Sequence, residues 1–406
     1  MKNNFKVNAW KNCKLNEVCQ ILDGKRKPIN SDERKKRIDG KKREELYPYF
    51  GATGQVGLID DFLLDGEFVL LGEDGAPFLE SFKNKAYIVK GKVWVNNHAH
   101  VLKSYTSNKF LCYYLNQINY RGFVTGTTRL KLNQSSMKEI PVPSPPLEVQ
   151  IEIVSKIEQL FTEIDKGTES LKTSQKQLKV YRQSLLKWAF EGKLTNMDVK
   201  DSELPEGWKW VKINEIGKIK GGKRLPAKHY YSDEPTDYIY IMAGNLKDGT
   251  VRNKLTYIKE ETYIALSNYK VTGGEVYITI VGACIGDAGV IPDNIGKSIL
   301  TENAAKIIDL KSIQNKYLAL WINSLNCQLQ IKRKILSATL GKLALNRIGI
   351  LNLPLPPLEE QELIVDELES KLTVCDKIEE TISQSLMQAE TLKQSILKKA
   401  FEGRLI

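Results

Sequence analysis

An internal repeat constrains the fold of this chain more than any other feature of its sequence. Residues 145–194 begin PPLEVQIEIVSKIEQLF and end QSLLKWAFEGKL, and residues 356–405 begin PPLEEQELIVDELESKL and end QSILKKAFEGRL. The offset is the same at both ends (356 − 145 = 211 and 405 − 194 = 211), so the segments align without a gap. Roughly half of the aligned positions are identical, far above the few per cent that average residue usage produces by chance. The chain therefore contains two copies of one unit.

Fainter similarity extends the duplication to the segments that precede each repeat. The matching pairs are Trp10 with LNEV at 15–18 against Trp208 with INEI at 213–216, and IPVP at 140–143 against LPLP at 353–356. The order along the chain is therefore globule, helix, globule, helix. We predict globular domains over residues 1–143 and 205–353, and long helices over residues 144–194 and 354–406.

Each repeat predicts a long helix with one narrow apolar face. Prolines open both segments, as suits a helix start. Apolar residues then recur every seven positions, which is the spacing of a coiled-coil seam. A second row of positions lies three residues after these, and from it we assign Leu160, Tyr181, Ile378 and Leu392 to the seam. The predicted seam residues are Ile157, Leu160, Ile164, Leu171, Leu178, Tyr181 and Leu185 in the first helix, and Leu368, Cys375, Ile378, Ile382, Ala389, Leu392 and Ile396 in the second.

The weaker residues along this seam favour antiparallel pairing of the two helices within one chain. Gly167, Ser174 and Lys371 would make poor contacts in a symmetric homodimer, whereas antiparallel pairing lets bulky residues face small ones. The alternative is that each helix packs on its own globule. At ~1.5 Å per residue each helix would be roughly 65–70 Å long, and so a rigid spacer between two globules related by a pseudo-two-fold axis.

Both globules have the pattern of an α+β domain. Short strand-like runs alternate with glycine-containing turns, as in EFVLLGEDG at 67–75 and EVYITIVGACIGDAGVI at 275–291. Each globule then ends in an expected helix, over residues 108–120 and 314–329. Strands followed by a helix within one compact unit are typical of the α+β class.

The charge of the chain favours a polyanionic partner, with nucleic acid as the first candidate. Sixty Lys and Arg residues stand against 49 Asp and Glu, a net charge of +11. Basic residues cluster beside glycines and hydroxyls at corresponding places in both globules, which suits phosphate contact, although solvated surface loops are an equal alternative. The predicted DNA contacts are Lys25, Arg26, Lys27, Lys35, Lys36, Arg37, Lys41, Lys42, Arg43, Thr127, Thr128, Arg129 and Lys131 in the first globule, and Lys220, Lys223, Arg224, Lys228, Lys332, Arg333, Lys334, Thr339 and Lys342 in the second.

Three further polar residues are candidates for reading base edges. Asn97 and His98 lie in VNNHAHVL, which aligns with LTENAAKI and so places His98 opposite Asn303. Side-chain amides and imidazoles can form paired hydrogen bonds with bases. A structural role, in which they tie a strand to a loop, is an equal alternative.

The sequence offers little for catalysis. GKIKGGK at 217–223 has the spacing of a phosphate-binding loop, but Arg224 stands where Ser or Thr would hold Mg²⁺. His98 and His100 have no evident third metal ligand among only three histidines. Six scattered cysteines without a C-x-x-C pair, together with the lack of any apolar run of about 18 residues, predict a reduced cytoplasmic protein.

These features together resemble the specificity subunit of type I restriction–modification systems, over essentially the whole chain. The most specific motifs are the duplicated helix entries and endings, PSPPLEVQ at 143–150 with AFEGKL at 189–194, and PLPPLEEQ at 354–361 with AFEGRL at 400–405. YPYFGATGQVG at 47–57 and KVTGGEVYITIVG at 270–282 also resemble patterns of that family.

The resemblance implies that each globule reads one half of a split DNA target, while the helices set the unread spacer. It further implies that two methyltransferase subunits bind the helices and adjoining surfaces, with two restriction subunits joining outside. Those partners would bring S-adenosylmethionine, Mg²⁺ and ATP, whereas this chain would bind none of them and catalyse nothing itself. Without its partners the chain is expected to self-associate. The alternatives are a stand-alone DNA-modifying enzyme or nuclease, and a coiled-coil scaffold for proteins only.

Overall fold

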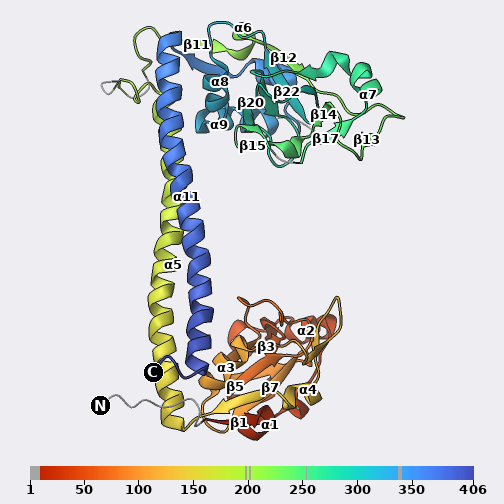
Figure 1. The fold of residues 1–406 in the computed structure, drawn as a ribbon, viewed down its shortest axis with the longest axis vertical. Coiled ribbons are helices and arrows are strands. Elements are labelled where there is room, and N and C mark those ends of the chain that lie inside the picture. Colours follow the sequence, from red (N-terminus) through yellow and green to blue (C-terminus); the bar gives the residue numbers. More distant parts are fainter. Residues whose placement is uncertain (1–9, 197–198, 201–202, 253, 337–340) are drawn as a thin grey trace. The chain divides into compact units, whose positions relative to one another are not determined.

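The chain folds into two compact units, each of which combines one globule with part of both long helices. A computed structural model describes residues 10–196, 199–200, 203–252, 254–336 and 341–406. Unit 1 comprises Met1–Thr173 and Ile382–Ile406, and unit 2 comprises Ser174–Thr381. The helices α5 (Leu147–Phe190) and α11 (Leu358–Phe401) each contribute to both units (Figure 1). The predicted α+β fold with two globules and two long helices is confirmed.

In unit 1 the globule is built on one mixed sheet with a helix against it. The sheet has the order β2-β7-β5-β6-β3-β4, and its pairs are antiparallel except for β3 with β6, where Tyr49 lies opposite Trp94. The core forms because Val69, Leu71 and Leu102 are buried against Phe110 of α3. The elements are β1 (Lys11–Lys14), α1 (Leu15–Val18), β2 (Cys19–Ile21), η2 (Asp23–Lys25), α2 (Ser31–Ile38), η3 (Arg43–Glu45), β3 (Tyr47–Gly51), β4 (Gly54–Ile59), β5 (Leu64–Gly72), β6 (Ala86–Val95), β7 (Ala99–Ser104), α3 (Asn108–Gln117), β8 (Val124–Thr125), β9 (Lys131–Leu132), α4 (Gln134–Lys138) and β10 (Pro141–Ser144).

The globule of unit 2 repeats this plan with its strands divided between the sheets β12-β22-β19-β20 and β13-β17-β14-β21-β18. In unit 1 the single long strand β6 pairs antiparallel with β5 and parallel with β3. In unit 2 two separate strands make such pairs, because β20 pairs antiparallel with β19 and β21 pairs parallel with β14. The elements are β11 (Lys209–Lys212), α6 (Ile213–Ile216), β12 (Lys218–Gly221), β13 (Tyr231–Ser232), β14 (Tyr238–Ile241), η4 (Ala243–Asn245), β15 (Leu246–Lys247), β16 (Thr250–Val251), β17 (Thr256–Ile258), α7 (Glu260–Ala265), η5 (Ser267–Tyr269), β18 (Lys270–Val271), β19 (Val276–Thr279), β20 (Ala288–Val290), β21 (Lys297–Leu300), β22 (Ala304–Ile308), α8 (Asn315–Ile322), α9 (Leu325–Leu336), α10 (Leu345–Gly349) and β23 (Asn352–Leu355).

Backbone hydrogen bonds fix how the two copies correspond just before each long helix. The amide of Leu15 donates to the carbonyl of Ile140 at 2.9 Å, and that of Ile213 donates to Leu351 at 3.2 Å. Ile140 therefore corresponds to Leu351, at the same offset as the repeats (351 − 140 = 211). The predicted match of residues 140–143 with 353–356 was wrong by two positions, because both segments alternate apolar residues with proline and look alike after a two-residue slip.

A buried glutamine ties each globule to the first turns of its helix. The side-chain oxygen of Gln150 accepts a hydrogen bond from the Thr106 hydroxyl at 2.9 Å, and that of Gln361 accepts one from the Gln314 amide at 2.8 Å. In both cases the amide nitrogen donates to a carbonyl five residues earlier, at 2.9 Å. Because buried polar groups are costly unless they are hydrogen-bonded, this arrangement fixes globule and helix together within each unit.

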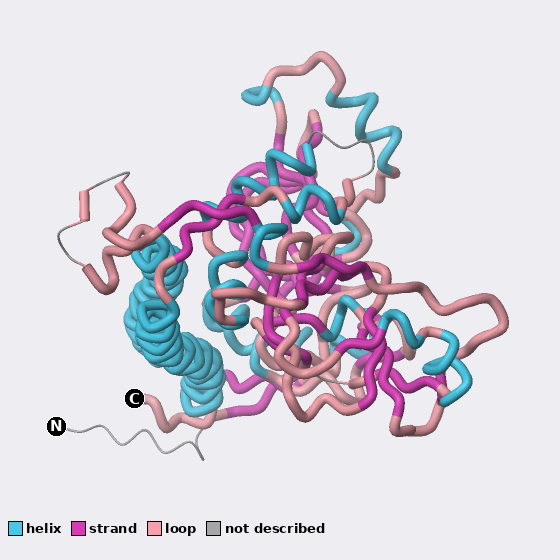
Figure 2. Tube along the Cα trace, turned by 90° about the horizontal axis from the view of Figure 1, so that it is seen from above, coloured by secondary structure: helices cyan, strands magenta, loops and turns pink. Residues whose placement is uncertain are grey.

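The two long helices are antiparallel in both units, and Figures 1 and 2 show them side by side. In unit 1, Nζ of Lys393 lies 2.6 Å from Oδ1 of Asp165, and in unit 2, Nη2 of Arg182 lies 2.6 Å from Oδ1 of Asp376. Asp165 and Arg182 are 17 residues apart in α5 (182 − 165 = 17). Their partners Lys393 and Asp376 are also 17 residues apart in α11 (393 − 376 = 17), but in the reverse order. The predicted antiparallel pairing within one chain is confirmed.

The second row of the predicted seam needs correction. The seven-residue series is buried or half-buried as expected, at Ile157, Ile164, Leu171, Leu178, Leu185, Leu368, Cys375, Ile382, Ala389 and Ile396, and Leu160 is half-buried against the first globule. However, Tyr181, Ile378 and Leu392 are 47%, 44% and 51% exposed. The second row lies four residues after each apolar one, where Arg182 and Lys393 are only 22% and 21% exposed. The choice of row was wrong because these polar side chains are covered through ion pairs, which an apolar pattern does not reveal.

Candidate nucleic-acid interface

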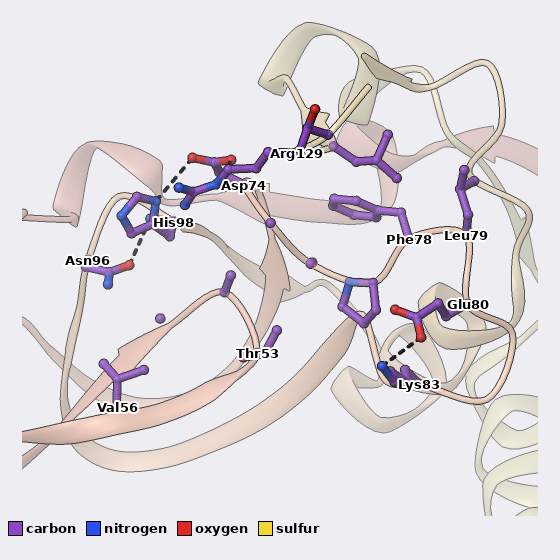
Figure 3. Close-up of a pocket in the computed structure, with 17 residues that line it drawn as sticks. Thr53, Val56, Asp74, Phe78, Leu79, Glu80, Lys83, Asn96, His98 and Arg129 are labelled. Atoms are coloured by element: carbon purple, nitrogen blue, oxygen red, sulfur yellow. Dashed lines mark hydrogen bonds and ion pairs between the residues drawn. The ribbon is translucent and has the colours of Figure 1, made fainter. Parts of the chain in front are cut away.

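A cleft of about 930 Å³ opens in the first globule, where four loops meet at the ends of strands (Figure 3). These loops are the β3–β4 turn, the segment that follows β5, the β6–β7 turn and the segment before β9. The lining is partly apolar: Phe78 is buried, and Leu79 and Val56 are 48% and 50% exposed. The polar part of the lining contains Asp74, Asn96, His98, Thr128 and Arg129.

The polar lining is organised around one carboxylate. Nε of Arg129 lies 2.6 Å from Oδ1 of Asp74, and Nδ1 of His98 lies 3.6 Å from Oδ2 of the same residue. The side-chain oxygen of Asn96 accepts a hydrogen bond from the backbone amide of His98 at 2.8 Å, which shapes the β6–β7 turn. The cleft therefore presents an imidazole and a guanidinium, both oriented by Asp74, beside an apolar wall.

A buried ionic network lies behind this lining and holds the loops in place. Nδ1 of His100 lies 2.7 Å from Oδ2 of Asp23, and its Nε2 lies 2.9 Å from the carbonyl of Leu132. Both ring nitrogens of His100 thus lie within hydrogen-bonding distance of oxygen atoms from other segments. Burial alone would raise the pKa of Asp23, but the hydrogen bonds from His100 and Gln134 outweigh it and lower that pKa.

Arg26 belongs to the same network and is not a surface contact. Its Nη1 lies 2.5 Å from Oε2 of Glu73 and donates to the carbonyl of Ala99 at 3.0 Å, and the side chain is only 15% exposed. The prediction of a DNA contact at Arg26 is corrected, because its guanidinium is used to join the segment after β2 to the ends of β5 and β7.

The basic helix α2 is fastened to the β3–β4 hairpin, whose turn lines the cleft. The guanidinium of Arg34 lies 4.8 Å from the ring centre of Tyr49, and that of Arg37 lies 4.9 Å from the ring centre of Trp94. Asp60, directly after β4, accepts a hydrogen bond from Nε of Arg37 at 2.6 Å and another from Nζ of Lys41 at 2.8 Å. Arg37 and Lys41 therefore anchor this segment, although Lys41 is itself 41% exposed. The other exposed basic residues of the region are Lys25, Lys27, Lys35, Lys36, Lys42 and Arg43.

In the second globule the turn equivalent to the β6–β7 turn supplies the carboxylate of a second arginine–carboxylate pair. The amide of Glu73 donates to the carbonyl of His98 at 2.8 Å and that of Ile280 donates to Asn303 at 2.8 Å, so residues 96–98 and 301–303 correspond, as predicted. In this turn Oε1 of Glu302 lies 2.8 Å from Nε of Arg224. Burial alone would raise the pKa of Glu302, but the hydrogen bonds from Arg224 and Thr301 lower it.

The comparison with known families decides which class of protein this is. The sequence model described as the type I restriction modification DNA specificity domain matches residues 8–173 and again residues 205–388. The two matches cover most of the chain and coincide with its duplicated halves. The chain belongs to the type I restriction–modification DNA specificity family.

Named relatives agree with this assignment. The Haemophilus influenzae protein S.HindORF215P, which carries the name of a type I restriction enzyme specificity subunit, is 30% identical over 257 residues, or 63% of this chain and 62% of that protein. The EcoBI specificity subunit of Escherichia coli is 29% identical over 312 residues, or 72% of this chain and 64% of that protein. The alignments thus span somewhat less than two thirds of these relatives.

Solved structures show the same fold. A chain from work on complex assembly and conformational transition of the type I R-M system superposes with a TM-score of 0.73 at 18% identity, covering 97% of this chain and 98% of that chain. The HsdS subunit from Thermoanaerobacter tengcongensis superposes with a TM-score of 0.54 at 18% identity, covering 99% of each chain. At this level of identity the likeness concerns the fold alone.

Within this family fold, the predicted interface residues fall into separate groups. His98, Thr128 and Arg129 meet in the cleft, with the exposed Asn97, Thr127 and Lys131 beside them. In the second globule Lys220, Lys223, Arg224, Lys228, Lys332, Arg333 and Lys342 are exposed, Asn303 and Lys334 are half-buried, and Thr339 lies outside the described residues. Arg333 of α9 is not part of the 301–303 turn region, because it lines a hollow with Trp210 and Phe190.

Sequence reasoning missed the carboxylates that organise both sites. Neither Asp74 nor Glu302 is among the predicted contacts, although Asn303, the neighbour of Glu302, is. The only sequence signal for either carboxylate would have been its position opposite a basic loop. In the part of the chain that the structure describes, no group of three or more His, Cys, Asp and Glu side chains is placed to hold a metal ion, and no helix is long and apolar enough to span a membrane.

Proposed function

We propose that this chain is the DNA-reading subunit of a type I restriction–modification complex, and that each globule reads one half of a split target. One observation carries the proposal. The duplicated fold presents the same turn twice, at residues 96–98 and 301–303, beside exposed basic residues, but with different polar side chains each time. Equivalent positions with different chemistry are what two different half-sites require, since base edges are distinguished by their donors and acceptors.

The exposed faces of the paired helices support a role in holding partner subunits. In unit 2, Val180, Trp188 and Val374 are 67%, 50% and 54% exposed, and in unit 1, Met387 and Leu392 are 69% and 51% exposed. Large apolar side chains in such numbers on helices favour protein contacts. We assign these faces to methyltransferase subunits, two in number because the repeat offers its surface twice, with two restriction subunits outside them.

The chemistry would then reside in the partners. S-adenosylmethionine, Mg²⁺ and ATP would be bound by the methyltransferase and restriction subunits, and this chain would supply sequence recognition without catalysis. The exposed apolar faces would also cause the isolated chain to self-associate. We place the assembled complex in the cytoplasm, where its DNA substrate lies.

The test is to reconstitute the full chain with the methyltransferase encoded beside it, and to map methylated sites genome-wide. We expect a motif of two short specific halves separated by an unread spacer, and a mass that corresponds to two methyltransferase copies for each copy of this chain. A continuous motif, or methylation that does not depend on this chain, would contradict the proposal. Methylation or cleavage by the purified chain alone would support a stand-alone enzyme, and binding without salt dependence would support a protein-only scaffold.

A further inference from the structure

One arginine of the cleft in the first globule is paired with a carboxylate. Asp74 binds Arg129 at Nε, with 2.6 Å between Nε and Oδ1. The carboxylate is mostly covered, at 25% exposure, while the arginine side chain is 62% exposed. His98 approaches the other carboxylate oxygen at 3.6 Å. The contact is at Nε, so the carboxylate holds the inner end of the guanidinium and leaves its two Nη groups for a ligand.

The second globule contains the same device, built from other residues. Glu302 binds Arg224 at Nε, with 2.8 Å between Nε and Oε1, and the arginine side chain is 80% exposed. The other carboxylate oxygen is held by the hydroxyls of Tyr240 at 3.3 Å and Thr301 at 3.2 Å. Here too the carboxylate is the anchored partner, 27% exposed, and the guanidinium extends outward.

The two arginines come from different loops, and only Arg224 contacts the 301–303 turn directly, whereas Arg129 pairs with Asp74 beside the equivalent 96–98 turn. Arg129 precedes β9, whereas Arg224 follows β12. Glu302 occupies the position of Asn97 in the turn, and His98 reaches Asp74 from that turn in the first globule. Arg224 aligns with the internal Arg26, because GKRLP at 222–226 matches GKRKP at 24–28, whereas Arg129 comes from another loop. The two copies thus place an exposed arginine beside a carboxylate in different ways.

We propose that Arg129 and Arg224 each read a guanine, one in each half-site, through their two Nη donors. This inference rests on the proposed function and names what its sites recognise. In the major groove guanine presents O6 and N7 as neighbouring acceptors, and arginine to O6 and N7 is the commonest specific protein–DNA contact. The planar guanidinium matches that pair of acceptors with its two Nη donors, and each carboxylate restricts where the guanidinium can lie by holding its Nε.

A phosphate contact explains this geometry less well. Phosphate binding depends mainly on positive charge, and a neighbouring carboxylate cancels part of that charge at Asp74 and at Glu302. The carboxylate does not reduce the number of Nη donors available to guanine, because it binds Nε and leaves both Nη groups to the ligand. Lys35 of α2, which is exposed and outside the cleft lining, is the kind of residue that phosphate contact requires.

The experiment uses the reconstituted complex of the full chain with its methyltransferase, and maps methylated sites for the variants Arg129→Lys, Arg129→Ala and Arg224→Lys. Lysine keeps the charge but loses the bidentate fork. We expect both Arg129 variants to lose discrimination at one guanine position of one half-site, by roughly 5- to 150-fold. Arg224→Lys should do the same in the other half-site. The unchanged half-site in each variant controls for folding and assembly, and Lys35→Ala should leave every position of the motif unchanged.

The outcomes separate this inference from the proposed function. If the wild-type complex gives no split motif, the proposed function fails. If the wild-type motif is split but contains no guanine whose recognition depends on Arg129 or Arg224, only the guanine assignment is overturned. A uniform loss of methylation at all sites in Arg129→Ala, rescued in Arg129→Lys, would identify a phosphate contact and would also overturn it.

Discussion

Nδ1 of His100 lies 2.7 Å from Oδ2 of Asp23 in the interior of the first globule, where His100 is fully buried. The pair links the segment after β2 to β7, and through the Leu132 carbonyl it reaches β9, directly after the loop that carries Arg129. Neither residue faces the cleft, yet both determine where its lining lies. The proposed DNA-reading surface therefore depends on a charged pair that DNA would not touch.

Replacing His100 by alanine should destabilise unit 1 strongly. The substitution removes the nearest side-chain partner of the buried Asp23 carboxylate, while Nη2 of Arg26 stays 3.4 Å from Oδ2. Leaving a buried polar group without a hydrogen-bond partner costs about 1–3 kcal/mol. Urea unfolding of the full chain should show this loss in the transition that reports on unit 1. The matched control is His98→Ala, in a side chain that is 41% exposed, which should change stability by less than about 0.5 kcal/mol. Equal effects of the two substitutions would contradict the assigned network.

The Asp23 carboxylate should also make the first globule sensitive to acid. Its pKa is lowered in the folded protein, so it binds a proton more readily when unfolded, at the ordinary value of about 3.9. The stability it contributes is fully present above that ordinary value and is lost as the pH falls through the lower folded-state pKa. Asp23→Asn should be less stable than the wild type near neutral pH, with a flatter loss of stability below about pH 4. If stability fell with pH in the same way in the wild type and in Asp23→Asn, Asp23 would not contribute to the acid sensitivity of the globule.

The helix seam gives a prediction that distinguishes the observed row from the expected one. Leu368 and Ile378 lie in the same helix and the same unit, but Leu368 is fully buried and Ile378 is 44% exposed. Leu368→Ala should lower the free energy of unfolding by about 2–5 kcal/mol. Ile378→Ala should lower it by less than about 0.5 kcal/mol. A large loss in the free energy of unfolding for Ile378→Ala in the isolated chain would instead support the seam predicted from the sequence.

The seam also shows what the sequence could and could not predict. The seven-residue recurrence that runs through Ile157 and Leu368 identified both helices and their buried row, because apolar burial leaves a period in the sequence. The second row was missed because Arg182 and Lys393 are covered through ion pairs, which leave no apolar signal. Antiparallel pairing could still be predicted, since it followed from the arrangement of bulky and small residues and not from the exact row.

The candidate site divides in the same way. The exposed lysines of α2 and the 96–98 turn were recognisable from charge and from the alignment of the two copies. The roles of Arg26, Asp74 and Glu302 were not, because they depend on which carboxylate meets which guanidinium across loops distant in sequence. Arg26 and Arg129 look alike as basic residues next to a turn, yet one is 15% and the other 62% exposed. Only the tertiary fold separates an internal arginine from one available to DNA.

Lengthening the paired helices should lengthen the unread spacer without changing either half-site. The pairs Asp165–Lys393 and Arg182–Asp376 lie on either side of the boundary between the units in both helices. Seven residues inserted after Thr173 and seven after Thr381 would keep both pairs and the seam in register, and add roughly 10 Å of helix, or about three base pairs. The methylation map of the reconstituted complex should then show the same two halves farther apart.

The matched control for this change is the insertion after Thr173 alone. It leaves α11 unchanged, so Asp165–Lys393 and Arg182–Asp376 cannot both form with the seam intact. We expect lower stability and weak or mixed spacing, because the antiparallel register must slip in one of the units. If the single and the paired insertion gave the same longer spacer, the helices would not act as a pair. If either insertion altered the half-sites themselves, the division of labour between helices and globules would be wrong.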